Sequence, residues 1–191
     1  MFIQKKVIEH LNGHKGGVVW FTGLPGSGKT TLSHYVEKEL FNRGVQCVVI
    51  DGDQLRAGLN QDLGFSEDDR RENLRRAAEV AVMFLNVGFI VLVPMISPSR
   101  EVRSKTRLRF NSKEFAEVYV KCSVETCEQR DPKGLYLKAR QGELRDFTGI
   151  DATYETPIQP ELTIDTENES IEKCMQVIVN FIIKKFAIKS G

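Results

Sequence analysis

Apolar residues occur along this chain in two alternating patterns. Short continuous runs rich in β-branched and aromatic residues are typical of buried strands, and apolar residues spaced by three and four positions are typical of helices that bury one face. The runs predict strands at residues 17–22, 45–50, 89–95, 115–120 and 161–166. The spaced positions predict helices at residues 31–42, 71–87, 100–110, 124–130 and 170–186.

The order of these elements predicts the fold class. Strands that alternate with helices favour right-handed β-α-β units, and such units build a parallel sheet. We therefore expect an α/β fold in which helices flank a five-stranded parallel sheet. Ligands of such sheets bind at the carboxyl ends of the strands. The loops to inspect for a site are those after Thr22, Ile50, Met95 and Val120.

Residues 131–160 differ in composition from the rest of the chain. They lack a long apolar period and contain three glycines and three prolines. This composition fits a mobile lid over a site, with a middle part, 135–145, that could be helical. No repeat, low-complexity tract or linker divides the sequence, so residues 1–191 are expected to form one domain that carries this lid.

The loop after the first predicted strand has the pattern G-x-x-x-x-G-K-[ST]. In such a loop the backbone N–H groups converge on phosphate oxygens, Lys29 can reach the terminal phosphates, and the Thr30 hydroxyl can bind Mg²⁺. An ordinary glycine-rich turn is the alternative, but the flanking strand and helix are the context that the motif requires. We expect a P-loop fold that binds ATP through Gly23, Leu24, Pro25, Gly26, Ser27, Gly28, Lys29, Thr30 and Thr31.

Composition and charge exclude several other classes of protein. The formal net charge is +1, so no global basic field attracts nucleic acid or an anionic membrane. No apolar run approaches the ~20 residues of a membrane span, and residues 1–15 lack the apolar core of a signal peptide. The four cysteines have no metal-binding spacing and are expected to be reduced, mostly buried thiols. We expect a cytoplasmic protein.

Two carboxylates, Asp51 and Asp53, follow the second predicted strand. Near the phosphate loop they could hold Mg²⁺ or accept a proton from an attacking hydroxyl. A helix N-cap followed by a turn is the alternative, because aspartate is common at both positions. The presence of the phosphate loop favours the functional interpretation.

Arginine and aromatic residues farther along are candidates for binding a second substrate. Arg56 and Arg70 could hold an anionic group through forked hydrogen bonds, and Phe65 could stack on a base. By composition alone, the arginines at 70, 71, 75 and 76 and the basic run 100–113 are more typical of solvated helix faces. No N-K-x-D sequence of the guanine-reading kind is present, so a small domain with a lid favours a kinase that phosphorylates a small acceptor.

Matches to one family extend from residue 17 to the last predicted helix. They include DGDQLR at 51–56, LGFS at 63–66, ISP at 96–98, CEQRD at 127–131, KGLY at 133–136 and FTGID at 147–151. Shorter matches fall at 58–60, 69–70, 72–73, 75–76, 79–81, 138–140, 142–143, 154–155 and 160–162. Together these segments closely resemble the adenylylsulfate (APS) kinase family, and they are more specific than a phosphate loop alone.

The resemblance implies transfer of the ATP γ-phosphoryl group to the 3′-hydroxyl of APS, giving PAPS, with Mg²⁺ as cofactor and a homodimer as the assembly. Phe65 and Phe147 would stack on opposite sides of the APS adenine, and Arg130 would lie near the ATP adenine. Asp53 or Asp51 would orient the acceptor hydroxyl or complete the Mg²⁺ shell. The implied APS-binding residues are Asp53, Arg56, Phe65, Arg70, Asn73, Ile96, Ser97, Lys133 and Phe147.

Ser97 is the position of a phosphoserine intermediate in bacterial members of the family, so the resemblance places it with Lys29, Asp51 and Asp53 among the catalytic residues. Its alternatives are a hydroxyl that contacts substrate or one that caps the next helix. The chain departs from the family at Pro25, where Ser is usual, at Ser99, where an aromatic residue or His is usual, and around residues 102–103, where an Asp-Arg pair is usual.

Two other functions remain open. A kinase of the same fold could act on a different nucleotide conjugate, and a catalytically idle domain could bind nucleotides to regulate a partner. The complete set of phosphate-loop and aspartate residues favours activity, and the near-neutral charge disfavours a nucleic-acid partner.

Overall fold

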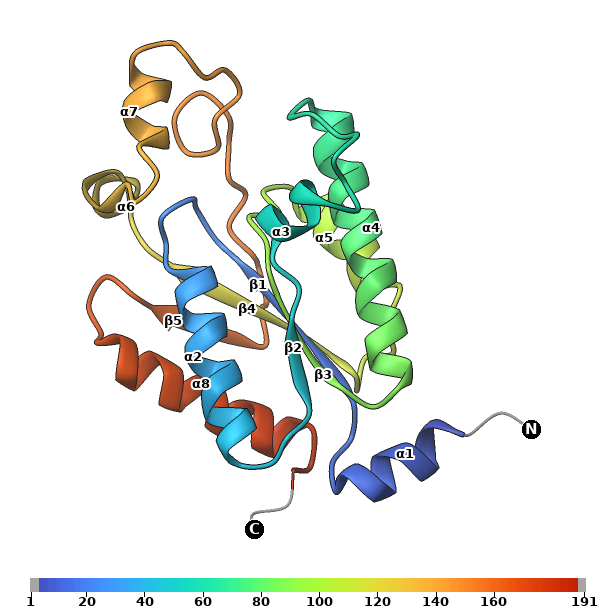
Figure 1. Ribbon diagram of the computed structural model, residues 1–191. Helices are drawn as coiled ribbons and strands as arrows, with labels where there is room; N and C mark the ends of the chain where they lie inside the picture. The colour runs from blue at the N-terminus through green and yellow to red at the C-terminus, as the bar shows by residue number, and fades with distance from the viewer. Residues whose placement is uncertain (1–3, 189–191) are drawn as a thin grey trace.

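The computed structural model describes residues 4–188 and contains one parallel sheet of five strands in the order β2-β3-β1-β4-β5 (Figure 1). The strands are β1 (Gly17–Thr22), β2 (Cys47–Val49), β3 (Ile90–Pro94), β4 (Phe115–Lys121) and β5 (Leu162–Asp165). Val19 of β1 is in register with Leu92 of β3 and with Ala116 of β4. The predicted α/β fold and parallel sheet are confirmed, with β1 at the centre of the sheet.

Helices cover both faces of the sheet (Figure 1). Side chains alternate along β1, so Val19 and Phe21 pack towards α2 and α8, whereas Val18 and Trp20 pack towards α4 and α5. The helices are α1 (Lys5–Asn12), α2 (Lys29–Asn42), α3 (Gly52–Ala57), α4 (Glu67–Asn86), α5 (Arg100–Arg107), α6 (Val124–Arg130), α7 (Leu135–Arg140) and α8 (Ile171–Lys185).

The structure differs from the predicted boundaries at polar helix starts. Helix α4 begins at Glu67 rather than residue 71, because the Ser66 hydroxyl caps it by accepting a hydrogen bond from the Asp69 N–H, and its first turn is acidic. Helices α1 and α3 were not predicted, since neither contains a buried residue. None of the described helices is long and apolar enough to span a membrane. The prediction that residues 1–15 hold no signal-peptide core includes residues 1–3, and the prediction of one domain over 1–191 also includes residues 189–191. Residues 1–3 and 189–191 lie outside the described part of the chain.

The lid segment, residues 131–160, packs above the carboxyl end of β1 (Figure 1). Its regular part is α7, which ends at Arg140 rather than residue 145. The Tyr136 ring is 1% exposed and its hydroxyl donates to the Pro25 carbonyl at 2.9 Å. Leu24 and Phe147 pack in the same apolar cluster. This cluster attaches the lid segment directly to the phosphate loop.

Candidate active site

The phosphate loop joins β1 to α2 in a conformation that depends on glycine. Gly26 and Gly28 have φ values of 76° and 94°, in the left-handed region. A Cβ atom at Gly26 would also lie 2.9 Å from the Cys127 carbonyl oxygen. Pro25 fits at its position because its contact there is made by the backbone carbonyl, which a proline retains. This carbonyl accepts a hydrogen bond from the Tyr136 hydroxyl. The unusual proline therefore leaves the loop geometry in place.

Lys29 lies in the first turn of α2 with its amine turned back over the loop. Its Nζ donates to the carbonyls of Gly23 at 3.0 Å and Leu24 at 2.6 Å. Burial lowers the pKa of Lys29 to about 8, while the Asp51 and Asp53 carboxylates oppose that shift and the Lys133 charge adds to it. The amine is thus held at the loop, and its charge interacts with groups from two other parts of the chain, the start of α3 and the lid segment.

Thr30 and Asp51 bring a hydroxyl and a carboxylate together beside the loop. Thr30 Oγ1 donates to Asp51 Oδ2 at 3.0 Å. The other carboxylate oxygen, Asp51 Oδ1, accepts from the N–H groups of Asp53 at 2.8 Å and Gln54 at 3.4 Å. Asp51 therefore is the N-cap of α3, the alternative considered from the sequence, and also presents an oxygen beside the Thr30 hydroxyl. Oxygen pairs of this kind suit Mg²⁺, which takes few protein ligands and keeps its waters and the substrate phosphates.

Asp53 and Lys133 form an ion pair between α3 and the lid. Both side chains are more than half exposed, at 69% and 60% respectively. Asp51 caps α3 with its carboxylate, whereas the Asp53 carboxylate pairs with Lys133 of the lid. The structure therefore brings together two predicted site residues that are 80 positions apart in the sequence.

Arg56 of α3 and Phe65, in the loop before α4, lie against each other. The Arg56 guanidinium is 4.5 Å from the Phe65 ring centroid, and its Nη1 donates to the Gly64 carbonyl at 2.7 Å. The Phe65 side chain remains 70% exposed. An exposed aromatic ring backed by a guanidinium presents a flat face on which a base could stack.

Arg70 connects the Phe65 loop to the lid. Its Nε donates to the Phe65 carbonyl at 2.8 Å, and its Nη1 lies 3.4 Å from Thr148 Oγ1.

The Phe147 ring is only 9% exposed and packs edge-on against Tyr136 with centroids 5.0 Å apart. In this structure Phe147 is part of the lid's own apolar cluster, so its ring does not present the open stacking face that the resemblance implies.

Asn73, in α4, is held by a residue that the sequence did not single out. Asn60 Nδ2 donates to Asn73 Oδ1 at 2.8 Å, and Asn60 is fully buried. Asn60 Oδ1 is buried without a hydrogen-bond partner. In the sequence, the segment 58–60 stands out only as a family match, because no local pattern marks a buried amide that orients another amide.

Ser97 and Ile96 form the loop after β3, at the edge where the site was predicted. Ser97 is 2% exposed with a φ of 47°, and its Oγ accepts from Trp20 Nε1 at 2.9 Å. The Ile96 carbonyl accepts from Thr22 Oγ1 at 2.7 Å. The alternative in which Ser97 caps the next helix is wrong, because Ser99 is the N-cap of α5.

Arg130 closes the site on the β5 side. Its Nη2 donates to the Thr166 carbonyl at 2.6 Å, and Thr166 Oγ1 donates to the Ser27 carbonyl at 2.9 Å. Thr31, the last residue of the predicted ATP contacts, is exposed in the first turn of α2. The residues of the predicted ATP side therefore adjoin the phosphate loop.

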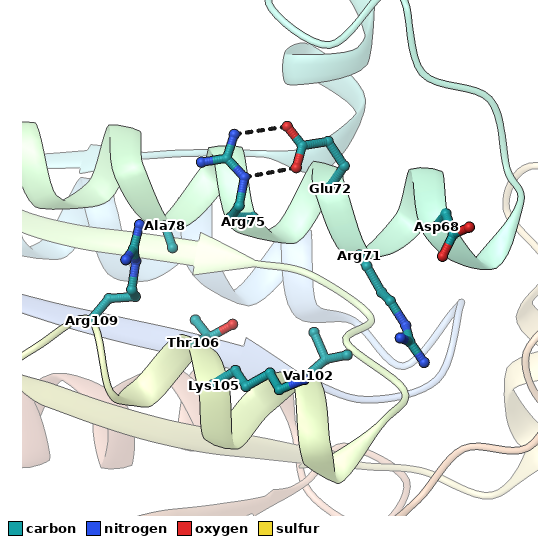
Figure 2. Close-up of a pocket in the computed structure, with 9 residues that line it drawn as sticks. All are labelled: Asp68, Arg71, Glu72, Arg75, Ala78, Val102, Lys105, Thr106 and Arg109. Atoms are coloured by element: carbon teal, nitrogen blue, oxygen red, sulfur yellow. Dashed lines mark hydrogen bonds and ion pairs between the residues drawn. The ribbon is translucent and has the colours of Figure 1, made fainter.

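A groove of about 450 Å³ between α4 and α5 lies outside this set of residues (Figure 2). Its cations are paired with carboxylates: Arg75 with Glu72, Arg71 with Glu67, Lys105 with Glu101 and Arg109 with Glu79. This agrees with the solvated basic faces predicted for these helices, except at one position. Arg103, within the same basic run, is only 5% exposed.

Comparisons with known proteins agree with this geometry. The family model described as adenylylsulphate kinase matches residues 15–165. A probable adenylyl-sulfate kinase from Halalkalibacterium halodurans is 51% identical over 189 residues, covering 99% of this chain and 91% of the relative. An adenylyl-sulfate kinase from Staphylococcus epidermidis is 53% identical over 180 residues, covering 94% and 90%. The structure of the Mycobacterium tuberculosis APS kinase in complex with AMPPNP and APS has a TM-score of 0.84 and 46% identity, covering 88% of this chain and 98% of that one. The chain belongs to the adenylylsulphate kinase family.

Proposed function

We propose that this chain transfers the γ-phosphoryl group of ATP to the 3′-hydroxyl of APS, giving PAPS and ADP. The observation that carries the proposal is the convergence of Lys29, Asp53 and Lys133, from the phosphate loop, α3 and the lid, at one place. Phosphoryl transfer needs mainly positioning and charge stabilisation. This convergence supplies both beside a loop built to hold phosphates.

The two aspartates have different surroundings, and these support different roles. The Asp51 carboxylate caps α3 and accepts from Thr30, so it is fixed and suited to the Mg²⁺ shell. The Asp53 carboxylate is 69% exposed and pairs with the Lys133 ammonium, so it is suited to orient the acceptor hydroxyl and accept its proton. Bound Mg²⁺ would neutralise charge on the transferring phosphates.

The acceptor side of the proposed site contains a stacking face and several hydrogen-bond donors. Phe65 with Arg56 behind it would take the adenine, and Arg70 would take an anionic group after exchanging its contact with Thr148. Phe147 reaches the adenine only if the lid cluster with Tyr136 opens, so acceptor binding would include a rearrangement there. Asn73, Ile96, Ser97 and Lys133 complete the proposed acceptor contacts.

Ser97 has an environment that supports direct transfer rather than a phosphoserine intermediate. Its hydroxyl is buried and accepts from the Trp20 indole, and no base is recorded beside it among the described residues. In-line transfer between two bound substrates needs no covalent step. We expect Ser97→Ala to retain substantial turnover, and loss of all activity in a folded Ser97→Ala protein would favour the intermediate.

We further propose that residues 1–191 act as one domain, that 131–160 moves as a lid, that the protein is a homodimer, and that it is cytoplasmic. The contacts of Tyr136 and Lys133 with the loop and with Asp53 support a closing lid. The homodimer rests on the family resemblance. Light scattering of the purified protein would measure the assembly.

The central experiment measures PAPS and ADP formed from ATP, Mg²⁺ and APS, with a panel of other nucleotides as acceptors. We expect APS to stimulate ADP release and Lys29→Ala to reduce transfer to any acceptor by roughly 10²-fold or more. ADP release with another nucleotide but not with APS would favour the same-fold kinase of different specificity. Binding of both substrates without turnover would favour an idle regulatory domain.

A further inference from the structure

Arg103, in α5, contacts three other segments of the chain with one buried guanidinium. Nη1 donates to the Ser97 carbonyl at 2.5 Å and to the Pro98 carbonyl at 3.1 Å. Nη2 donates to the Glu155 carbonyl at 2.5 Å, and Nε pairs with a Glu117 carboxylate oxygen at 2.8 Å. Because the side chain is 5% exposed, these contacts are made with little competition from water.

The first segment that Arg103 holds is the loop after β3. Ser97 has a φ of 47°, a conformation that is costly for a residue with a Cβ atom and that persists only where surrounding contacts impose it. Its backbone carbonyl accepts from Arg103, while its hydroxyl accepts from Trp20. Two buried donors, one from β1 and one from α5, therefore fix the orientation of this residue.

The second segment is the part of the lid that returns to the sheet, residues 152–160, here named the return segment. The Glu155 N–H donates to the Pro98 carbonyl at 3.0 Å, and the Glu155 carboxylate accepts from the Arg100 N–H at 2.5 Å. The Tyr154 hydroxyl lies 2.9 Å from Thr22 Oγ1. The return segment is thus bonded to the β3 loop, to α5 and to β1, with Arg103 at the centre of these contacts.

We propose that Arg103 is a positioning residue that sets the acceptor side of the site, by holding the Ser97 backbone in its left-handed conformation and fixing the downstream end of the lid at residues 154–155. It does not touch substrate. Its carbonyl contacts need a planar fork of donors, which the lysine ammonium cannot reproduce. This inference rests on the proposed function for its effect on APS, but its structural part stands independently.

The matched control is Arg107, one turn later on α5. Arg107 forms a forked pair with Glu161 at 2.5 and 2.8 Å and lies 3.5 Å from Glu117, so Arg107→Lys makes the same chemical change without touching the β3 loop. If Arg103 only stabilised α5, Arg103→Lys and Arg107→Lys would both lower Tm and leave the KM for each substrate unchanged.

The test measures steady-state kinetics and amide hydrogen exchange for wild type, Arg103→Lys, Arg107→Lys and Glu117→Gln. We expect Arg103→Lys to raise the KM for APS roughly 10-fold while the KM for ATP changes less than about 2-fold. Glu117→Gln should raise the ratio of the KM for APS to the KM for ATP by a smaller factor. Exchange at residues 96–99 and 152–156 should accelerate in Arg103→Lys and not in Arg107→Lys.

Equal changes in both KM values, or unchanged exchange in those two segments, would overturn the inference. If Arg103→Lys does not fold, Glu117→Gln decides by the same two measurements, because it removes the charge partner of Arg103 and disturbs Arg107 only through the longer contact of 3.5 Å. A wild-type protein that forms no PAPS would refute the proposed function, while the exchange comparison still decides whether Arg103 holds the two segments.

Discussion

The Nδ2 group of Asn60 donates to Oδ1 of Asn73 at 2.8 Å across a fully buried contact between the loop after α3 and helix α4. This bond occupies the oxygen of the Asn73 amide, so its NH₂ group is the part left to meet an acceptor. A buried amide that orients another amide fixes which hydrogen-bonding group the site presents. Asn60 therefore extends the predicted acceptor site by one buried residue that orients the Asn73 amide.

Replacing Asn60 with alanine should affect both stability and acceptor binding. The change leaves Asn73 Oδ1 without its donor at a position that is 6% exposed, and we expect the free energy of unfolding to fall by about 1–3 kcal/mol. The KM for APS should rise, while the KM for ATP stays near wild type. Urea unfolding and initial-rate kinetics measure the two effects.

A double-mutant cycle with Asn73→Ala tests whether the two amides act as a unit. If they do, the double variant should raise the KM for APS hardly more than Asn73→Ala alone. Strictly additive effects on the logarithm of KM would show instead that Asn60 acts on the site by another route.

Local patterns were sufficient to predict the sheet and the phosphate loop. Strand β1 is a continuous apolar run, and the loop residues that follow it are adjacent in sequence, so both can be recognised within a short window. Helix α3 could not be predicted in this way, because six residues capped by Asp51 show no apolar period. The acidic first turn of α4 was missed for the same reason.

The contacts that organise the site depend on tertiary structure and could not be read from local sequence. Lys133 and Asp53 were both named as site residues, but nothing in either segment indicates that they pair. Arg103 lies in a basic run that is typical of a solvated face, and its burial depends on the return segment packing over α5. Phe147 matched a stacking position, and only the structure shows its ring packed on Tyr136.

Two substitutions at Asp51 should separate its capping role from its proposed Mg²⁺ role. Asparagine caps helices about as well as aspartate, so Asp51→Asn should change the free energy of unfolding by only a few tenths of a kcal/mol, whereas Asp51→Ala should cost about 0.5–2 kcal/mol. Both variants lose the carboxylate beside Thr30 and should need more Mg²⁺ for half-maximal rate. Denaturant unfolding and Mg²⁺ titrations of the rate provide the measurements. A wild-type Mg²⁺ requirement in Asp51→Asn would remove Asp51 from the metal shell.

The pair of Asp53 and Lys133 should matter for turnover and hardly for stability. Because both side chains are largely exposed, breaking the pair should change the free energy of unfolding by no more than about 1 kcal/mol. Loss of the proposed base in Asp53→Asn should lower kcat by roughly 10²–10⁴-fold. Lys133→Ala should raise the KM for APS and lower kcat less than Asp53→Asn does. Near-normal kcat in a folded Asp53→Asn protein would transfer the proposed proton-accepting role to another group.

Lys29 should make ATP binding depend on pH in a defined direction. Burial lowers its pKa to about 8, so the free enzyme loses the ammonium charge as pH rises through that value. Bound phosphates favour the charged form and raise the pKa of Lys29 again. At pH values between the pKa of Lys29 in the free enzyme and its pKa in the complex, ATP binding must therefore take up a proton. The apparent affinity for ATP must then fall as pH rises above about 8.

Calorimetry of a nonhydrolysable ATP analogue in buffers of different ionisation enthalpy measures this uptake. From a free-enzyme pKa of about 8 we expect uptake by Lys29 of about 0.1 proton at pH 7 and about 0.9 proton at pH 9. Lys29→Met should bind more weakly at pH 7 and lose the increase in uptake between the two pH values. If wild type and Lys29→Met showed the same uptake at pH 9, the titrating group would lie elsewhere. An uptake that was already complete at pH 7 would mean that Lys29 is neutral in the free enzyme at that pH, and that its carbonyl contacts do not hold an ammonium.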